Sequence, residues 1–257
     1  MIEQDAELQR VSSSWHRGFS AIYHKELAAW FGTHKWIDRV IIWMALALVP
    51  AISVPTIGKD RGVAVLSLFL WSGSNMMSIG TIILTQGTII EEKLTQTLLW
   101  IFSKPLSPAG FILGKFAAYA VLIGSIVIGA PAIVVYCYAM FAGLPATISI
   151  FNYLIGVLMV YLVLLFILAL TILLGVLFDK IAAVTAISLA IFFSGAGLPS
   201  TQIRWIEPYT VCALQHNSYE TMTGKFPATG LFAMGSAVMS IMILLTIAIA
   251  WMDRSEL

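Results

Sequence analysis

The residues of this chain whose types suit chemistry or contact with water gather between Glu91 and Lys115. This segment holds a pair of glutamates, three lysines and two prolines, in a chain of 257 residues that is 60% apolar and 11% charged. Within it, residues 110–116 (GFILGKF) resemble a phosphate-binding loop only superficially. Three residues separate the glycines where that loop has four, and Phe116 replaces its Ser or Thr. We expect no nucleotide binding, and the segment is better interpreted as a contact surface.

The long apolar stretches of the sequence contain no ionisable residue and none of the four histidines. A proton-coupled transporter, an intramembrane hydrolase or a lipid-modifying membrane enzyme needs such groups within the bilayer, so all three classes are disfavoured. The two cysteines, Cys137 and Cys212, lack the spacing of a metal site, although a disulfide between them on the outer side stays open. We therefore expect no catalytic residue, metal or cofactor in this chain.

Composition and span lengths predict an all-α, polytopic membrane protein. Its net charge of +1 argues against nucleic acid as a partner, because phosphate binding needs an excess of Lys and Arg. Uncharged stretches long enough for a bilayer of ~30 Å recur along the chain. We expect six transmembrane helices preceded by an interfacial amphipathic helix. One break between spans is placed at Gly143, just before Leu144 and Pro145.

The predicted boundaries follow from where charged residues interrupt the apolar stretches. We expect a polar N-terminal tail at 1–13, a cytoplasmic interfacial helix at 14–36 and a six-span transmembrane domain at 37–257. The spans lie at about 40–57, 62–90, 116–142, 150–178, 181–203 and 229–251. A cytoplasmic segment at 91–115 follows the second span, and an outer loop at 204–228 precedes the sixth.

Most of the Lys and Arg residues fall on one predicted side of these spans. The preference of basic residues for the cytoplasmic side therefore predicts that both termini are cytoplasmic, in the plasma (inner) membrane. In the segment 14–36, apolar residues recur at helical spacing and include Trp15, Trp30 and Trp36. Tryptophan suits the headgroup level, which favours an interfacial helix over an ordinary soluble amphipathic one.

Apolar residues also recur at helical spacing within the segment 91–115. Leu94, Leu98, Ile101 and Phe102 share one face of a helix, and Lys104 and Pro105 end it. The pattern predicts a short helix that lies across the membrane surface, between the second and third spans. If the protein moves something uphill, its energy must come from another polypeptide, and this helix is the expected contact.

The same segment resembles the permeases of ATP-binding-cassette exporters of the type 2 class. The resemblance rests on an acidic residue at the end of span two, a Thr-Leu pair, a Ser-x-Pro-x-Ser element and a Gly-Lys pair opening span three. Lys25-Glu26-Leu27 is also similar to an N-terminal element of that family. The matching residues in this chain are Glu92, Thr97-Leu98, Ser103 to Ser107 and Gly114-Lys115. Leu94, Gln96 and Pro108 differ from the residues usual in the family.

The resemblance implies a subunit that pairs with a second permease copy, identical or different, and with two cytoplasmic ATPase subunits that bind ATP and Mg. It implies that residues 95–103 form the coupling helix, with Glu92 and Lys115 at the hinge ends of spans two and three. Ordinary anchoring of helix ends is the alternative for these two residues. The predicted coupling residues are Glu91, Glu92, Thr95, Thr97, Leu98, Ile101, Phe102, Ser103, Pro105 and Lys115.

Span two also carries neutral polar residues and glycines at seven-residue spacing, namely Gly73, Gly80 and Gly87. Close helix packing is the simpler interpretation of the glycines. The other is a translocation path for an apolar or amphiphilic cargo, lined by Asn75, Ser78, Thr85 and Gln86. Aromatic residues in the outer loop similarly indicate either a half-inserted helix or interfacial anchors.

Two functions fit this sequence. One is the permease subunit of an exporter, with membrane lipids around it and ATP hydrolysed by its partners. The other is a mechanical membrane scaffold that uses the same energy to act on an extracytoplasmic partner without moving a cargo.

Overall fold

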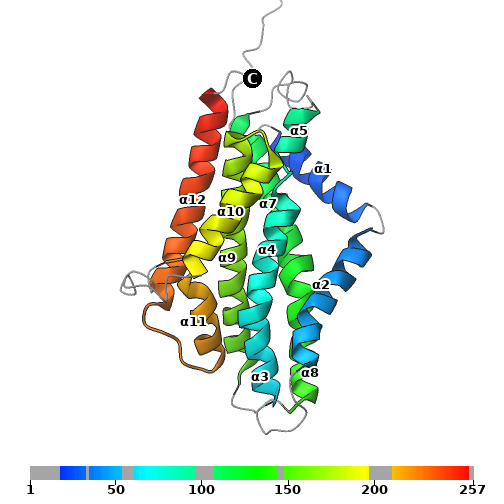
Figure 1. Cartoon of the computed structure of the whole chain (residues 1–257), viewed down its shortest axis with the longest axis vertical. Coiled ribbons are helices and arrows are strands. Elements are labelled where there is room, and N and C mark those ends of the chain that lie inside the picture. Colours follow the sequence, from blue (N-terminus) through cyan, green and yellow to red (C-terminus); the bar gives the residue numbers. More distant parts are fainter. Residues whose placement is uncertain are drawn as a thin grey trace, which may run out of the picture.

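The computed structural model describes residues 18–32, 35–53, 61–95, 107–143, 148–196 and 210–254. These residues form helices joined by turns and bends, and no strand occurs among them. Long helices lie side by side, and α1 (Phe19–Phe31) crosses them obliquely at one end of the bundle (Figure 1). The predicted all-α architecture is confirmed for the described residues.

Four helical units of the described residues are long and apolar enough to cross a membrane. The first, Arg61–Leu94, contains α3 (Arg61–Leu68), the π-helix η1 (Phe69–Gly73), α4 (Ser74–Thr85) and α5 (Ile90–Leu94). The second, Pro108–Phe141, contains α7 (Pro108–Leu122), the π-helix η2 (Ile123–Gly129) and α8 (Ala130–Phe141). The third and fourth are α9 (Ile150–Leu177) and α12 (Gly230–Arg254).

The other two predicted spans correspond to shorter helices. α2 (Lys35–Ile52) has 18 residues, or about 27 Å, and its first turns carry charged residues. α10 (Ile181–Ala196) has 16 residues, or about 24 Å. The later parts of the predicted spans 40–57 and 181–203 lie outside the described residues. Within the described ranges there are therefore four helical units long and apolar enough to cross a membrane, where the sequence predicts six spans.

The helix of the predicted third span begins earlier than its charge pattern indicates. It starts at Pro108 and not at residue 116, because Ser107 caps it by accepting a hydrogen bond from the Gly110 amide at 3.0 Å. Proline at the first helical position suits this cap. Lys115 is therefore inside α7, about two turns from its start, and the helix extends beyond the predicted span on this side.

The break between the second and third long helices lies where the sequence places it. α8 ends at Phe141, and Gly143 has a φ of +88°, a left-handed conformation that glycine adopts without strain. The next helix begins at Ile150, and the hydroxyl of Ser149 accepts a hydrogen bond from the Phe151 amide. The predicted helix break is confirmed.

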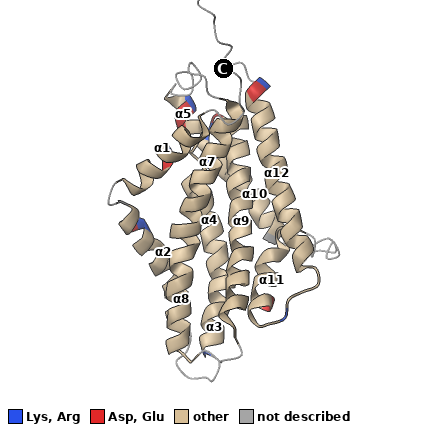
Figure 2. Cartoon of the chain, turned by 180° about the vertical axis from the view of Figure 1, so that it is seen from behind, with Lys and Arg blue, Asp and Glu red and all other residues tan. Residues whose placement is uncertain are grey.

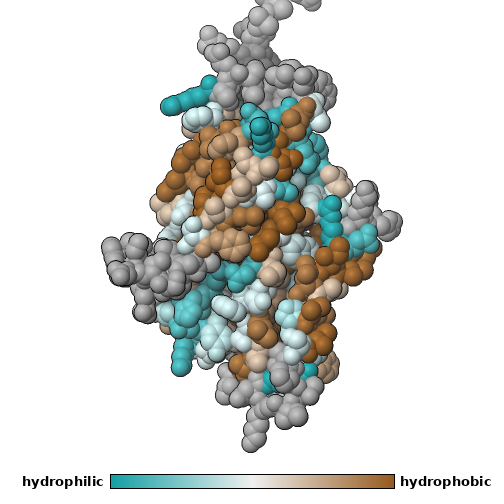
Figure 3. Space-filling model, viewed as in Figure 1, coloured by the Kyte–Doolittle hydropathy of each residue, from teal (hydrophilic) through white to brown (hydrophobic). Residues whose placement is uncertain are grey.

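Helix α9 is the central element of the bundle. It packs against α12, α11 (Ala213–Met222), α4, α10 and α7, and much of its length is buried. Leu164, Leu168 and Ile172 have no exposed surface. Since α12 and α2 keep rows of exposed apolar side chains, the outside of the bundle suits lipid while α9 suits a protein interior. Figure 3 shows hydrophobic residues over α10 and α12 and more hydrophilic ones over α11.

Glycines allow helices to approach closely at two points of this bundle. A Cβ added at Gly80 on α4 would overlap the ring of Trp43 on α2. A Cβ added at Gly156 on α9 would lie 2.8 Å from the Ser218 carbonyl oxygen on α11. Small residues at helix contacts are typical of membrane proteins. For Gly80, the structure supports the packing interpretation of the glycines in this helix.

Charged residues gather toward one end of the bundle. This end carries α1, α5 and the last turn of α12, and the C-terminus is marked beside it (Figure 1). Lys, Arg, Asp and Glu are sparse along the helices and more frequent here (Figure 2). The segment 91–115 therefore leaves and re-enters the bundle at its most charged end.

We expect Gly80→Ala to destabilise the protein by about 1–3 kcal/mol, because the new methyl group overlaps the Trp43 ring and pushes α2 from α4. The measurement is the unfolding midpoint of the purified chain in detergent. Gly235→Ala is the matched control, since a Cβ at Gly235 meets no atom within 4 Å. If both variants unfold like the wild type, the close approach of α2 and α4 is wrong.

Candidate functional site: a buried charge cluster

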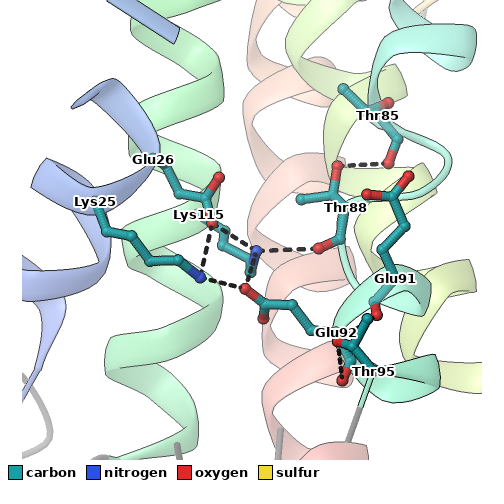
Figure 4. A network of polar contacts seen from close by, with 8 residues as sticks. All are labelled: Lys25, Glu26, Thr85, Thr88, Glu91, Glu92, Thr95 and Lys115. Atoms are coloured by element: carbon teal, nitrogen blue, oxygen red, sulfur yellow. Dashed lines mark hydrogen bonds and ion pairs between the residues drawn. The ribbon is translucent and has the colours of Figure 1, made fainter. Parts of the chain in front are cut away.

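Four charged side chains from three helices meet at the charged end of the bundle. They are Lys25 and Glu26 on α1, Glu92 on α5 and Lys115 on α7, and we call them the charge cluster. Figure 4 shows these side chains pointing toward one another, with Lys115 between the two glutamates. Residues separated by more than sixty positions in the sequence are thereby held together.

The contacts within the charge cluster are short. Lys115 Nζ donates to Glu26 Oε1 at 2.8 Å and to the Thr88 carbonyl oxygen at 3.0 Å. It also lies 3.2 Å from Glu92 Oε1. Lys25 Nζ donates to the same Glu92 oxygen at 2.6 Å and lies 3.8 Å from Glu26 Oε1. The Lys115 ammonium group thus makes two hydrogen bonds and a further ion pair with Glu92.

The interior part of the charge cluster is shielded from water. The side chain of Lys115 is 2% exposed, Glu26 10% and Glu92 12%, whereas Lys25 is half exposed. A buried charge is tolerated only when it is paired and hydrogen-bonded. Two lysines balance two glutamates here, so the cluster carries no formal net charge.

The local sequence explains why α1 reaches Lys115. Gly114 lies against α1, and a Cβ there would be 3.1 Å from both the Ile22 Cβ and the Phe19 carbonyl oxygen. Ile22 and Glu26 are four residues apart and share the buried face of α1. Because Gly114 lets α1 approach, the next residue, Lys115, can meet Glu26. The Gly-Lys pair thus combines a close helix contact with a buried charge.

The turn between α4 and α5 supplies the remaining contact. Residues 86–89 leave the helical path, and the Thr88 hydroxyl donates to the Thr85 carbonyl oxygen at 2.6 Å. The carbonyl oxygen of Thr88 accepts from Lys115, which joins this turn to α7. Glu92 Oε2 is buried without a hydrogen-bond partner among the described residues. A buried acceptor without a hydrogen bond lowers the stability of the fold by about 1–3 kcal/mol, so the other contacts of α5 must outweigh this loss.

A second contact joins α5 to the turn between α9 and α10. Lys93 Nζ donates to the Val176 carbonyl oxygen at 2.7 Å, to the Phe178 carbonyl oxygen at 3.3 Å and to Asp179 Oδ1 at 3.1 Å. The ammonium group thus lies at the C-terminal end of α9, where the helix dipole favours a positive charge. The end of α5 is therefore attached to α1, α7 and α9.

The predicted coupling residues divide into two groups. Glu92 and Lys115 belong to the charge cluster, Glu91 is exposed, and the Thr95 hydroxyl donates to the Glu91 carbonyl oxygen at 2.8 Å. α5 ends at Leu94. The predicted surface helix falls largely outside the described residues, as do Thr97, Leu98, Ile101, Phe102, Ser103 and Pro105.

The predicted lining residues of α4 take part in contacts within the bundle. Thr85 Oγ1 hydrogen-bonds to Thr171 Oγ1 on α9 at 2.8 Å, and Gln86 accepts from Thr185 on α10. Ser78 and Asn75 donate to carbonyl oxygens of their own helical unit, those of Ser74 and Trp71. A translocation path along these residues stays a prediction.

Two features of the site escaped the sequence analysis. Lys25 and Glu26 were noted only within a family-like motif, although the position of Glu26 four residues after Ile22 placed a carboxylate on the apolar face of α1. The interpretation of residues 91–115 as a segment suited to water also did not indicate that Glu92 and Lys115 would be buried. The structure buries Lys115 and Glu92, because opposite charges from neighbouring helices neutralise them.

The predicted outer loop contains a helix whose polar side chains face inward. In α11, Asn217, Ser218 and Thr221 are buried, and Thr221 Oγ1 donates to Met159 Sδ on α9 at 3.7 Å. Cys212 precedes this helix, and Cys137 is exposed on α8. The two cysteines do not form a disulfide.

The chain was also compared with known proteins. It matches no model of a known protein family and no curated protein. The geometry of the charge cluster and the resemblance of its motifs are therefore the basis for a functional proposal.

We expect Lys115→Met to destabilise the chain by about 3–5 kcal/mol, because Glu26 and Glu92 would remain buried with only Lys25 to pair them. The measurement is the free energy of unfolding in a denaturing-detergent titration. Lys225→Met, at an exposed lysine, is the control.

Adding Glu26→Gln to Lys115→Met should recover part of this loss, since it removes the excess negative charge that the loss of Lys115 leaves in the cluster. Strictly additive effects of the two substitutions would contradict the direct pairing of Glu26 with Lys115.

Proposed function

We propose that this chain is the membrane-spanning permease subunit of an ATP-binding-cassette exporter of the type 2 class. Two cytoplasmic ATPase subunits would bind ATP and Mg, and a second permease copy would complete the complex in the plasma membrane. The observation that carries the proposal is that α5 and α7, the helices on either side of residues 96–106, each contribute a residue to one buried charge cluster, Glu92 and Lys115. The motifs in and beside this segment, including Glu92 and Gly114-Lys115, are those that resemble the family.

The charge cluster is suited to pass a displacement from the segment 96–106 into the bundle. α5 ends at Leu94 and α7 begins at Pro108, so the two helices flank this segment directly. Glu92 and Lys115, on these two helices, lie 3.2 Å apart in a water-poor environment. An ion pair strengthens when water is excluded, so α5 and α7 should move together when an ATPase presses on the segment.

The contacts of Lys93 would pass this movement on to a second pair of helices, α9 and α10. Through the Val176 carbonyl oxygen and Asp179, α5 is attached to the end of α9 and the start of α10. α9 in turn packs on α11 at the far end of the bundle. A push at 96–106 would therefore reach the opposite end of the bundle through packed helices.

The positions of the helix ends support both termini on the cytoplasmic side. α1, α5 and the end of α12 lie at the same end of the bundle (Figure 1). If α2 and α10 complete six crossings with the four long helices, the chain returns to the side on which it starts. α1 would lie at the membrane interface, with Trp30 stacked against the Arg39 guanidinium at 3.6 Å and packed on Tyr119.

An apolar or amphiphilic substrate suits this bundle best, because the candidate lining residues of α4 are neutral. One observation favours the alternative of a mechanical scaffold: Thr85 and Gln86 are engaged in contacts between helices. Vesicles that contain the whole complex separate the two functions. An exporter hydrolyses ATP faster when its cargo is present, whereas a scaffold responds to its extracytoplasmic partner.

We expect a photo-crosslinking amino acid at position 101, in the chain expressed in its own membrane, to capture a cytoplasmic ATPase. The reason is that residues 96–106 form the proposed contact. The same amino acid at position 141 is the control, because Phe141 is 92% exposed at the opposite end of the bundle. Captured proteins are identified by mass spectrometry. Equal capture at both positions, or no ATPase at position 101, would refute the proposal.

A further inference from the structure

A cavity of about 380 Å³ lies between α9, α10, α11 and α12, away from the charge cluster. Its volume falls within the ~300–1,000 Å³ range of small-molecule sites. Among the described residues that line it there is no Asp, Glu, Lys or Arg. The cavity therefore suits a ligand that carries no charge where it is enclosed.

The walls of the cavity are formed mainly by apolar side chains. α9 contributes Val163, Ile167 and Leu170, and α10 contributes Ile191 and Phe192. An apolar cavity of this kind stays dry and accepts apolar ligands, because water would find few hydrogen-bond partners in it. Hydrocarbon is the chemistry that these walls favour.

One edge of the cavity is polar, and a donor there lacks a partner. Gln215 on α11 lines the cavity, and its Nε2 is buried without a hydrogen-bond partner among the described residues. Across from it, α12 contributes Ser236, whose hydroxyl donates to its own helix at the Ala233 carbonyl oxygen. The unmatched group is therefore a donor, and it calls for an acceptor oxygen on the ligand.

The surroundings of the cavity connect it to the bilayer. α9 and α12 are of membrane length, and α10 and α12 carry exposed apolar side chains next to the lining residues, including Phe193, Met239 and Ile243. A hydrocarbon chain from the surrounding membrane thus has an apolar approach to the cavity.

We propose that this cavity binds one hydrocarbon chain that ends in a carbonyl oxygen, with that oxygen accepting from Gln215 Nε2. The chemistry is shared by the acyl ester of a membrane lipid and by a free fatty ester. Ligand binding at this cavity does not require a partner ATPase, so it can be tested independently of the proposed function. The proposal also gives α11 a role, because a bound ester would supply the hydrogen-bond acceptor that buried Gln215 Nε2 lacks among the described residues.

The test uses the full chain in phosphatidylcholine nanodiscs and three photoreactive probes of equal chain length. They are a diazirine-bearing fatty acid methyl ester, a phosphatidylcholine with the same chain, and a hydrocarbon without the ester. After irradiation, mass spectrometry maps the labelled peptides. We expect saturable ester labelling in α9, α11 and α12 that excess methyl palmitate competes away.

Three variants, one of them a control, make the test more specific. Ser240→Phe should reduce ester labelling at least severalfold, because Ser240 lines the cavity and the larger ring fills it, whereas Met239→Phe on the exposed side of α12 should not. Gln215→Leu should lower ester labelling about two- to tenfold through loss of one hydrogen bond, and leave hydrocarbon labelling unchanged. Unfolding midpoints of all variants confirm that they fold.

Labelling by the phosphatidylcholine probe identifies a membrane lipid as the source, and labelling by the free ester alone identifies a separate amphiphile. Either supports the proposal. Unsaturable labelling spread evenly over the lipid-facing helices, or equal labelling of wild type and Gln215→Leu by the ester probe, would overturn it.

Discussion

A lysine ammonium buried at the end of an apolar bundle is the constraint on which the other features depend. Lys115 is 2% exposed, and removing such a charge from water costs several kcal/mol unless partners surround it. α1 supplies Glu26, α5 supplies Glu92, and the turn before α5 supplies the Thr88 carbonyl oxygen. Two segments distant in the sequence, α1 and residues 88–92, are therefore joined to α7 by one side chain.

Much of the fold was predictable because it depends on local chemistry. The break at Gly143 follows from glycine before proline, and the long apolar stretches predict long helices. The helix α7 begins before the predicted span, because charge marked the span boundary whereas the Ser107 cap and Pro108 set the start of the helix. The charge cluster could be predicted only in part, because the pairing of Glu26 with Lys115 depends on how α1 crosses α7 at Gly114, and no local pattern encodes that crossing.

The two ends of the bundle have different physical characters. At one end, charged groups hold α1, α5, α7 and α9 together around a segment suited to receive force. Toward the other, α11 turns neutral polar side chains into the bundle and borders an apolar cavity, where the Gln215 amide is a buried donor without a hydrogen-bond partner among the described residues. Helix α9 contacts elements of both ends, including α7 and α11. In the proposed complex, an ATP-driven movement at the first end and an amphiphile bound at the second would therefore both act on α9.

We infer that Lys115 makes α1 and α5 a single cooperative unit. Hydrogen exchange of the full chain in nanodiscs, followed by mass spectrometry for wild type and Lys115→Met, measures this directly. We expect amides of α1 and α5 to exchange at a common slow rate in the wild type and to lose their protection together in the variant. Faster exchange confined to α7, with α1 and α5 unchanged, would contradict it.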